Sequence, residues 1–301
     1  MARFADRVID RMRKLGHPLC VGLDPYLDQI PPPFRRGAMS PGRPETGQAV
    51  EEFCCRTIDL IATDVAIVKP QVALFERLGW RGWQVLEQVI DHAHAAGLLV
   101  LLDAKRGDIA ETATAYAQAY LAPDAPCSVD AMTVNPYLGP KSLEPFLVEA
   151  ENGDRGVVVL CRNSNLDSSV YQALETPRGP FFAVVAASLS QWQQRLAGGT
   201  TAWSSLGVTV AATHAEDTER IRAALPRVLF LVLGYGAQGA SAREAVRGFC
   251  RGPAGLEGGI VSSSRPILFP SGPSDLGAQA WERGVRSALA RATSELGEAV
   301  A

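Results

Sequence analysis

Two aspartates flank a lysine at a spacing that suits acid–base chemistry. The apolar run Leu98–Ala104 leads through Asp103 into Lys105, and Asp108 follows after a short turn. If the run is a strand, Asp103 and Lys105 point to the same face, because side chains alternate along a strand. Charged groups buried there must pair with one another. The cluster is either a structural salt bridge or, as we favour, a proton-donating lysine held among carboxylates.

Two earlier apolar runs also end in a charged residue. Asp24 follows Val21-Gly22-Leu23, and Lys69 lies near the end of the run Val65–Pro70. If these runs are neighbouring parallel strands, their ends deliver Asp24, Lys69, Asp103 and Lys105 to one place. Acids and bases that alternate in this way predict a hydrogen-bonded charge network, which favours a functional interpretation over a purely structural cluster.

A second feature, near the carboxyl end, is typical of phosphate binding. A glycine-rich turn, Gly234-Tyr235-Gly236-Ala237-Gln238-Gly239, follows the run Val228–Leu233, and Arg265 follows the run Gly259–Ser263. Glycine lets backbone N–H groups approach an anion, and arginine binds phosphate with two hydrogen bonds. The glycines alone fit any tight turn, but their coincidence with Arg265 favours a phosphate site.

Eight short apolar runs rich in Val, Ile and Leu alternate with longer helical patterns, without polar alternation inside the runs. This is typical of parallel strands covered on both faces. The runs are Leu19–Asp24, Val65–Pro70, Leu98–Ala104, Val129–Asn135, Gly156–Cys161, Gly207–Ala212, Val228–Leu233 and Gly259–Ser263. Eight such runs predict an α/β fold of the (β/α)8 TIM-barrel type. A doubly wound open sheet is disfavoured because it usually needs fewer strands and no GxGxxG follows the first run.

We expect the 301 residues to form a single barrel domain with two insertions, after strands one and five. The first is the Pro/Gly/Arg-rich loop of residues 31–47, and the second is the stretch 163–199. Both would leave carboxyl ends of strands, where barrel active sites are built. The expected helices are residues 2–15, Glu51–Ala62 with Thr46 as its cap, Trp83–Ala96, Ile109–Leu121, Glu216–Leu225 and Asp275–Val300.

Composition and charge exclude several classes of protein. The chain has 29 Lys and Arg against 32 Asp and Glu, a net charge of −3, and no basic run longer than two, which argues against a nucleic-acid partner. The longest uncharged stretch, residues 196–215, is rich in Gly, Thr and Ser, so we expect no membrane span. The six cysteines and four histidines show no metal-ligand spacing. We expect no bound metal, free thiols even at the adjacent Cys54 and Cys55, and a cytoplasmic location.

The motif Asp103-x-Lys105-x-x-Asp108-Ile109, with Asp24 and Lys69 at earlier strand ends, resembles the orotidine 5′-phosphate decarboxylase family in its longer bacterial form. The likeness extends to Gly236-Ala237-Gln238-Gly239 and to Arg265, so it covers nearly the whole chain. The resemblance implies decarboxylation of orotidine 5′-monophosphate to uridine 5′-monophosphate in de novo pyrimidine biosynthesis, without a cofactor. It also implies that Lys105 protonates C6 of the pyrimidine as carbon dioxide leaves.

The resemblance also implies a role for individual residues. Asp103 would lie beside the substrate carboxylate, and Lys69, Asp103, Lys105 and Asp108 would form the charge network. Asp24 and Lys69 would bind the ribose, and Ser164 would contact the pyrimidine. Gln238 and Arg265 would bind the phosphate. The other implied substrate-binding residues are Ile109, Thr112 and Gly239. Asp108 and Thr112 would reach into the partner's site, so the enzyme would be a homodimer with shared active sites.

The same residues are also consistent with other functions. A related sugar-phosphate decarboxylase shares the DxKxxD motif and would need magnesium, which Asp103 could bind. A Schiff-base aldolase is disfavoured because Lys105 between carboxylates should stay protonated. A non-catalytic barrel that binds a phosphorylated ligand would need the phosphate site but not the charged cluster. The segment Asn163-Ser164-Asn165 is equally consistent with a polar turn and with a contact to a heterocycle.

Overall fold

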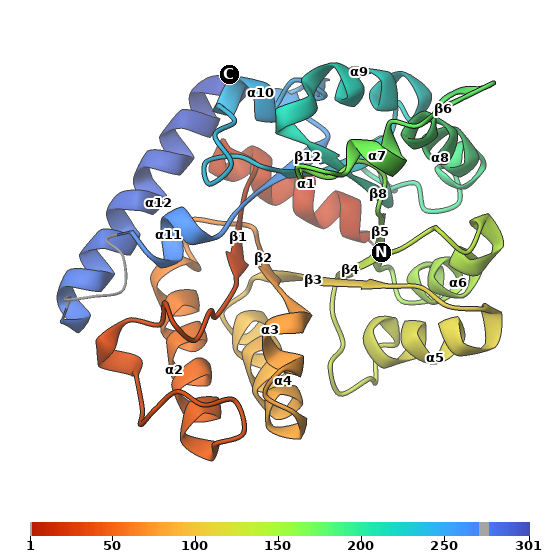
Figure 1. The fold of residues 1–301 in the computed structure, drawn as a ribbon. Helices are drawn as coiled ribbons and strands as arrows, with labels where there is room; N and C mark the ends of the chain where they lie inside the picture. Colours follow the sequence, from red (N-terminus) through yellow and green to blue (C-terminus); the bar gives the residue numbers. More distant parts are fainter. Residues whose placement is uncertain (1, 271–276) are drawn as a thin grey trace.

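The computed structural model describes residues 2–270 and 277–301 and shows a closed barrel of eight parallel strands (Figure 1). The strands, in chain order, are β1 (Leu19–Leu23), β2 (Ile67–Pro70), β3 (Leu99–Arg106), β4 (Ala131–Val134), β5 (Gly156–Val159), β8 (Ser204–Ala211), β9 (Val228–Leu233) and β12 (Gly259–Ser263). Each pairs with its neighbours in this order, and β12 pairs with β1 to close the ring. The predicted TIM barrel is confirmed, and all eight expected strands form.

Helices surround the strands, as Figure 1 shows. The longer ones are α2 (Pro44–Ile61), α4 (Trp80–Ala95), α5 (Ala110–Leu121), α6 (Glu144–Asn152), α8 (Phe181–Leu189), α9 (Ala215–Ala224) and α12 (Ala278–Val300). The short ones are α3 (Val72–Glu76), α10 (Ala242–Ala245) and α11 (Arg265–Leu268). Of the expected helix Asp275–Val300, residues 275 and 276 lie outside the described part, and α12 begins after Gly277. Among the described residues, no helix is both long and apolar enough to cross a membrane.

The leading helix α1 (Phe4–Leu15) closes the end of the barrel at which the strands begin. Its apolar side chains recur at helical spacing, and Phe4, Val8 and Ile9 are buried. They pack in one cluster with side chains from the barrel strands, among them Leu101 and Leu231. Gly16 ends the helix in the left-handed conformation, which glycine adopts without strain. The strand ends on this side are therefore sealed, and the opposite mouth is left for chemistry.

The first insertion is only partly the loop that the sequence predicts. A short 3-10 turn (Pro32–Phe34) leads to α2, which already begins at Pro44. Proline is favoured in the first turn of a helix because its missing N–H would have no partner there. The prediction that Thr46 caps this helix is wrong: Thr46 lies inside α2, and its hydroxyl donates to the Ser40 carbonyl at 2.8 Å.

The second insertion has its own small elements. It contains α7 (Ser169–Gln172) and a hairpin of β6 (Glu175–Thr176) and β7 (Gly179–Pro180), and β6 projects from the body in Figure 1. Leu166 and Tyr171 of this segment are exposed. The chain then returns to the barrel through α8. The first residues of the insertion, 164–167, line an open cavity with residues that follow β8 and β9.

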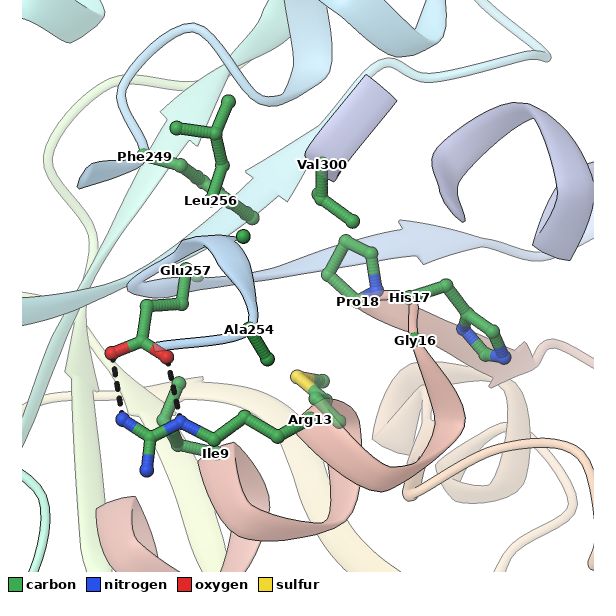
Figure 2. Close-up of a pocket in the computed structure, with 13 residues that line it drawn as sticks. Ile9, Arg13, Gly16, His17, Pro18, Phe249, Ala254, Leu256, Glu257 and Val300 are labelled. Atoms are coloured by element: carbon green, nitrogen blue, oxygen red, sulfur yellow. Dashed lines mark hydrogen bonds and ion pairs between the residues drawn. The ribbon is translucent and has the colours of Figure 1, made fainter. Parts of the chain in front are cut away.

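A second hairpin closes the sealed end. Strands β10 (Cys250–Gly252) and β11 (Gly255–Glu257) pack against α1 and the end of α12 around a cavity of about 40 Å³ (Figure 2). On its wall the Arg13 guanidinium donates to both carboxylate oxygens of Glu257, at 2.7 and 2.8 Å. Trp203 Nε1 donates to the same carboxylate at 2.9 Å. The cavity is far smaller than a typical ligand site, and its charges satisfy one another, so its role is structural.

All six cysteines are free, as expected, including the adjacent Cys54 and Cys55. Cys20 belongs to the apolar cluster beneath α1, and Cys250 packs against it. These thiols contribute apolar packing only, and α1 also makes polar contacts with the loop before β8.

We predict that Asp6 of α1 is a major anchor of the sealed end. Its buried carboxylate accepts hydrogen bonds from the backbone N–H groups of Gly199, Thr200 and Thr201 and from the Thr201 hydroxyl. Burial alone would raise the pKa of Asp6, but these bonds outweigh it and hold the pKa well below its usual value. Asp6→Asn should therefore lower the free energy of unfolding by at least about 3 kcal/mol at pH 7, measured by urea denaturation.

The loss of stability caused by Asp6→Asn should become smaller as the pH falls. Because the folded pKa of Asp6 is depressed, its stabilisation is present above the unfolded pKa of about 3.9 and is lost as the pH falls through the folded value. The difference between Asp6→Asn and the unsubstituted chain should be constant from pH 7 to about pH 5 and shrink below about pH 4. A difference that grows on acidification would contradict this account.

Candidate active site

A buried carboxylate between two lysines forms the centre of the barrel mouth. Lys69 Nζ donates to Asp103 Oδ2 at 2.9 Å, and Lys105 Nζ donates to Asp103 Oδ1 at 2.5 Å. Lys69 lies near the end of β2, and the other two lie near the end of β3. Asp103 and Lys69 are buried. The structure thus brings together three of the four residues expected to form the charge network.

The charges in this cluster stabilise one another. Burial alone would raise the pKa of Asp103, but the ammonium groups of Lys69 and Lys105 outweigh it and hold that pKa well below its usual range. Burial alone would likewise lower the pKa of Lys69, yet the carboxylates of Asp103 and Asp24 raise it above its usual value. Asp103 therefore stays ionised and Lys69 stays protonated at neutral pH.

Two further side chains hold Asp103, and sequence reasoning missed both. Gln71 Nε2 donates to Asp103 Oδ2 at 3.1 Å, and the Thr133 hydroxyl donates to Oδ1 at 3.0 Å. Gln71 follows β2 directly. Thr133 is a lone hydroxyl inside the apolar run of β4, and that polar interruption is the signal that could have found it. Each oxygen of Asp103 thus accepts two hydrogen bonds.

The contact between Lys105 and Asp103 does not result from the regular alternation of side chains along a strand. Its backbone has a φ of 49°, in the left-handed region that residues other than glycine rarely adopt. The pairing of β3 with β4 shifts register between Leu102 and Arg106 at the same place. The expected proximity of Asp103 and Lys105 is confirmed, but a bulge produces it.

Asp24 lies at the end of β1, beside the cluster. Its Oδ1 atom is buried and has no hydrogen-bond partner among the described residues. The strand passes close to the end of β12: a Cβ at Gly22 would lie 1.8 Å from Ser264 Oγ and 2.9 Å from Ser264 Cβ, so any larger residue would displace Ser264. A buried carboxylate oxygen without a donor is an open acceptor position for a ligand hydroxyl.

The glycine-rich turn after β9 lies next to Arg265. Gly234, Gly236 and Gly239 have φ values of 94°, 72° and 87°, which only glycine adopts readily. A Cβ at Gly236 would lie 3.4 Å from Pro266, the neighbour of Arg265 at the start of α11. Arg265 is exposed. The two halves of the predicted phosphate site, from the ends of β9 and β12, are therefore adjacent.

Ser164 and Gln238 line one open cavity, together with Thr213 and His214. A Cβ at Gly234 would lie 3.0 Å from Gln238 Oε1 and 3.4 Å from Ser164 Cβ, so both side chains flank this glycine. The strand-five loop that carries Ser164 is held by a buried arginine. Arg162 donates to Asp217 at 2.9 Å, to Ser168 at 2.8 Å and to Ser169 at 2.9 Å.

Asp108 does not join the network within its own chain. Its Oδ1 accepts from the Ile109 N–H at 2.8 Å, just before α5. Ile109 and Thr112 are exposed beside it, with Ile109 60% exposed. Among the described residues, no hydrogen bond or ion pair joins Asp108 to Lys105, and residues 107–109 form an irregular link between β3 and α5.

Comparison with known proteins agrees with this geometry. A family model described as orotidine 5′-phosphate decarboxylase / HUMPS matches residues 17–275. The chain belongs to this family. The resemblance drawn from the sequence is confirmed, and so is the expectation that the chain is an enzyme. The matched range includes the glycine-rich turn and Arg265 as well as the charged cluster.

Relatives of this decarboxylase family match the chain almost end to end. Orotidine 5′-phosphate decarboxylase of Rhodopirellula baltica is 38% identical over 303 residues, which cover 99% of each chain. That of Deinococcus radiodurans is 37% identical over 278 residues, 91% of this chain and 92% of the relative. A crystal structure titled putative orotidine 5′-phosphate decarboxylase from Streptomyces avermitilis shares 32% identity, covers 100% of this chain and 96% of that one, and has a TM-score of 0.80.

We predict that Lys69 and Asp103 are energetically coupled. Asp103→Asn leaves Lys69 buried without its counter-charge, and Lys69→Met removes one of the two cations that stabilise the Asp103 carboxylate. Each single change should lower the free energy of unfolding by about 3–5 kcal/mol. The double variant should lose at least about 1 kcal/mol less than the sum of the two, because it removes both charges together. Urea denaturation of all four proteins measures this, and additive losses would show that the pair is not coupled.

Proposed function

We propose that the chain decarboxylates orotidine 5′-monophosphate to uridine 5′-monophosphate in pyrimidine biosynthesis, without a cofactor. The observation that carries the proposal is the Lys69–Asp103–Lys105 cluster at the barrel mouth, in which Lys69 and Asp103 are buried and Lys105 is exposed. Family membership and near full-length similarity to relatives named orotidine 5′-phosphate decarboxylase support it. We include in the proposal a single barrel domain and, from the free thiols, a cytoplasmic location.

Lys105 is the proton donor in this proposal. The bond between C6 and the carboxylate carbon breaks, carbon dioxide leaves, and the electron pair stays on C6. The Nζ proton of Lys105 is then transferred to C6, and solvent restores the proton on the amine. No carbonyl adjacent to C6 can delocalise the developing charge, so a cation fixed in advance has to stabilise it. The Asp103 carboxylate keeps Lys105 in place and lies beside the substrate carboxylate.

The remaining residues bind parts of the nucleotide away from C6. The unpartnered Oδ1 of Asp24 accepts a ribose hydroxyl, with Lys69 beside it. Arg265 and Gln238, with the N–H groups of the turn that includes Gly239, bind the phosphate. Ser164 contacts the pyrimidine across the cavity from Gln238. Binding energy from the phosphate can hold the loops after β5 and β9 closed over the reacting carbon.

The active unit in this proposal is a homodimer. Asp108, Ile109 and Thr112 sit at the exposed start of α5, outside their own chain's network. The neighbouring surface carries exposed apolar side chains, including Tyr137 at 84% and Leu138 at 55% exposure. A two-fold interface over this surface would bring Asp108 and Thr112 of each protomer to the partner's mouth. Lys105 would then lie between its own Asp103 and a second carboxylate from the partner.

The first test is Lys105→Ala, assayed with orotidine 5′-monophosphate and no added metal. Loss of a contact made to the transition state lowers kcat, and loss of a general acid costs at least about a hundredfold. The measurement is the fall in absorbance as substrate is consumed, with circular dichroism and product binding as checks of folding. A folded variant with unchanged kcat would refute the assigned role. An unsubstituted protein that leaves the substrate intact would refute the proposed function itself.

The second test mixes two inactive variants, Lys105→Ala and Asp108→Ala. If Asp108 completes the partner's site, a mixed dimer has one site with both defects and one with neither, by two-fold symmetry. About half of the sites in each mixed dimer should then be active. Turnover is measured after co-refolding, with subunit exchange confirmed by differently tagged chains. The control mixes Lys105→Ala with the double variant, which leaves no intact site. Confirmed mixed dimers without recovered turnover would mean that Asp108 serves its own chain.

A further inference from the structure

The Thr133 hydroxyl lies at the junction of the backbone and the side chains that make up the charged cluster. Thr133 is fully buried on β4. It donates to Asp103 Oδ1 at 3.0 Å and accepts from the N–H groups of Ala104 and Lys105, both at 2.9 Å. A hydroxyl has one hydrogen to donate and two lone pairs. All three positions are therefore used, and all three partners belong to one short segment of β3.

This segment is where β3 departs from regular pairing. Leu102 lies opposite Met132, and Arg106 lies opposite Val134, so three residues of β3 face Thr133 alone. Extra residues in a strand leave backbone groups without ladder partners. The two N–H groups at the bulge, those of Ala104 and Lys105, donate to the Thr133 hydroxyl instead. The threonine side chain thus supplies the acceptor that a regular β4 backbone would otherwise supply.

The bulge determines where the Lys105 ammonium lies. The backbone of Lys105 is left-handed, with a φ of 49°, a conformation that costs energy for a residue with a side chain. From it, the side chain folds back so that Nζ lies 2.5 Å from Asp103 Oδ1, the oxygen to which Thr133 donates. One hydroxyl therefore fixes both the backbone that carries the lysine and the carboxylate oxygen that the lysine binds.

We propose that Thr133 is a positioning residue for the reaction: it holds the bulge that aims Lys105 at the reacting carbon. The proposal rests on the proposed function, in which Lys105 donates the proton. Thr133 acts through Lys105 and Asp103, so its loss should slow the chemical step more than it weakens nucleotide binding. A threonine that only filled space in the core would affect stability and leave the kinetic constants of the folded fraction unchanged.

The experiment compares Thr133→Val and Thr133→Ser with a matched buried control, Thr57→Val. Valine keeps the shape of threonine and removes all three hydrogen bonds, whereas serine keeps the hydroxyl. Thr57 is equally buried, but its hydroxyl donates to the Phe53 carbonyl within α2. A displacement of about 1 Å at a reacting group can cost about a hundredfold in rate. We expect Thr133→Val to lower kcat by about 10- to 100-fold with KM changed by less than about threefold.

The two companion variants make the result specific. Thr133→Ser should keep kcat within about threefold of the unsubstituted enzyme, and Thr57→Val should keep it within about twofold, even where both lose stability. Uridine 5′-monophosphate affinity, measured by calorimetry, should be the same in all variants. The proposal is overturned if Thr133→Val matches Thr57→Val in kcat, if Thr133→Ser is as slow as Thr133→Val, or if KM alone changes.

A second pair covers the case in which Thr133→Val does not fold. Thr133→Cys and Thr133→Ser both lose the methyl group, but a thiol is a weak hydrogen-bond donor and acceptor. Thr133→Cys should then show the lower kcat, and equal values would overturn the proposal. Failure of the proposed function gives a different result, because the unsubstituted protein would not consume orotidine 5′-monophosphate at all. An active unsubstituted enzyme with an inactive Lys105→Ala variant and a fully active Thr133→Val variant refutes the positioning role alone.

Discussion

The buried carboxylate of Asp103 is the constraint on which the rest of the site depends. Removing an ion from water is unfavourable, and hydrogen bonds and opposite charges offset this only when they satisfy every acceptor position of the carboxylate. Here Oδ1 accepts from Lys105 and Thr133, and Oδ2 accepts from Lys69 and Gln71. These donors come from β2, β3, β4 and the residue that follows β2. A parallel barrel suits this demand, because it brings the carboxyl ends of neighbouring strands to one rim.

The sealed end of the barrel makes this precision possible. Helix α1 fills the space beneath the strand starts with Phe4, Val8 and Ile9, and Asp6 ties it to the loop before β8. Apolar burial and satisfied hydrogen bonds at that end stabilise the strands. The stability of the strands in turn supports two unfavourable features at the mouth: the left-handed Lys105 and the unpartnered oxygen of Asp24. Strained or unsatisfied groups persist only where the surrounding structure holds them.

The sequence predicts the strands well because strands covered on both faces consist of continuous apolar runs. It also predicts that Asp24, Lys69, Asp103 and Lys105 share one mouth, since each ends such a run. It does not reveal the bulge at Lys105. The bulge is a shift in the pairing of β3 with β4, and the sequence of one strand does not specify how it pairs with another. For the same reason the contacts of Thr133 could not be predicted. The position of Asp108 likewise depends on the irregular segment 107–109 that follows β3.

The geometry distinguishes the two lysines that bind Asp103. The Lys69 side chain is only 5% exposed, and its pKa is raised above the ordinary value by Asp103 and Asp24 in spite of burial, so it holds its proton firmly. The Lys105 side chain is 39% exposed and opens to the mouth, where a substrate would lie. An acid must be within reach of the atom that it protonates before its pKa matters. This difference supports the proposed division of roles, in which Lys69 is the fixed counter-charge of the cluster and Lys105 donates the proton.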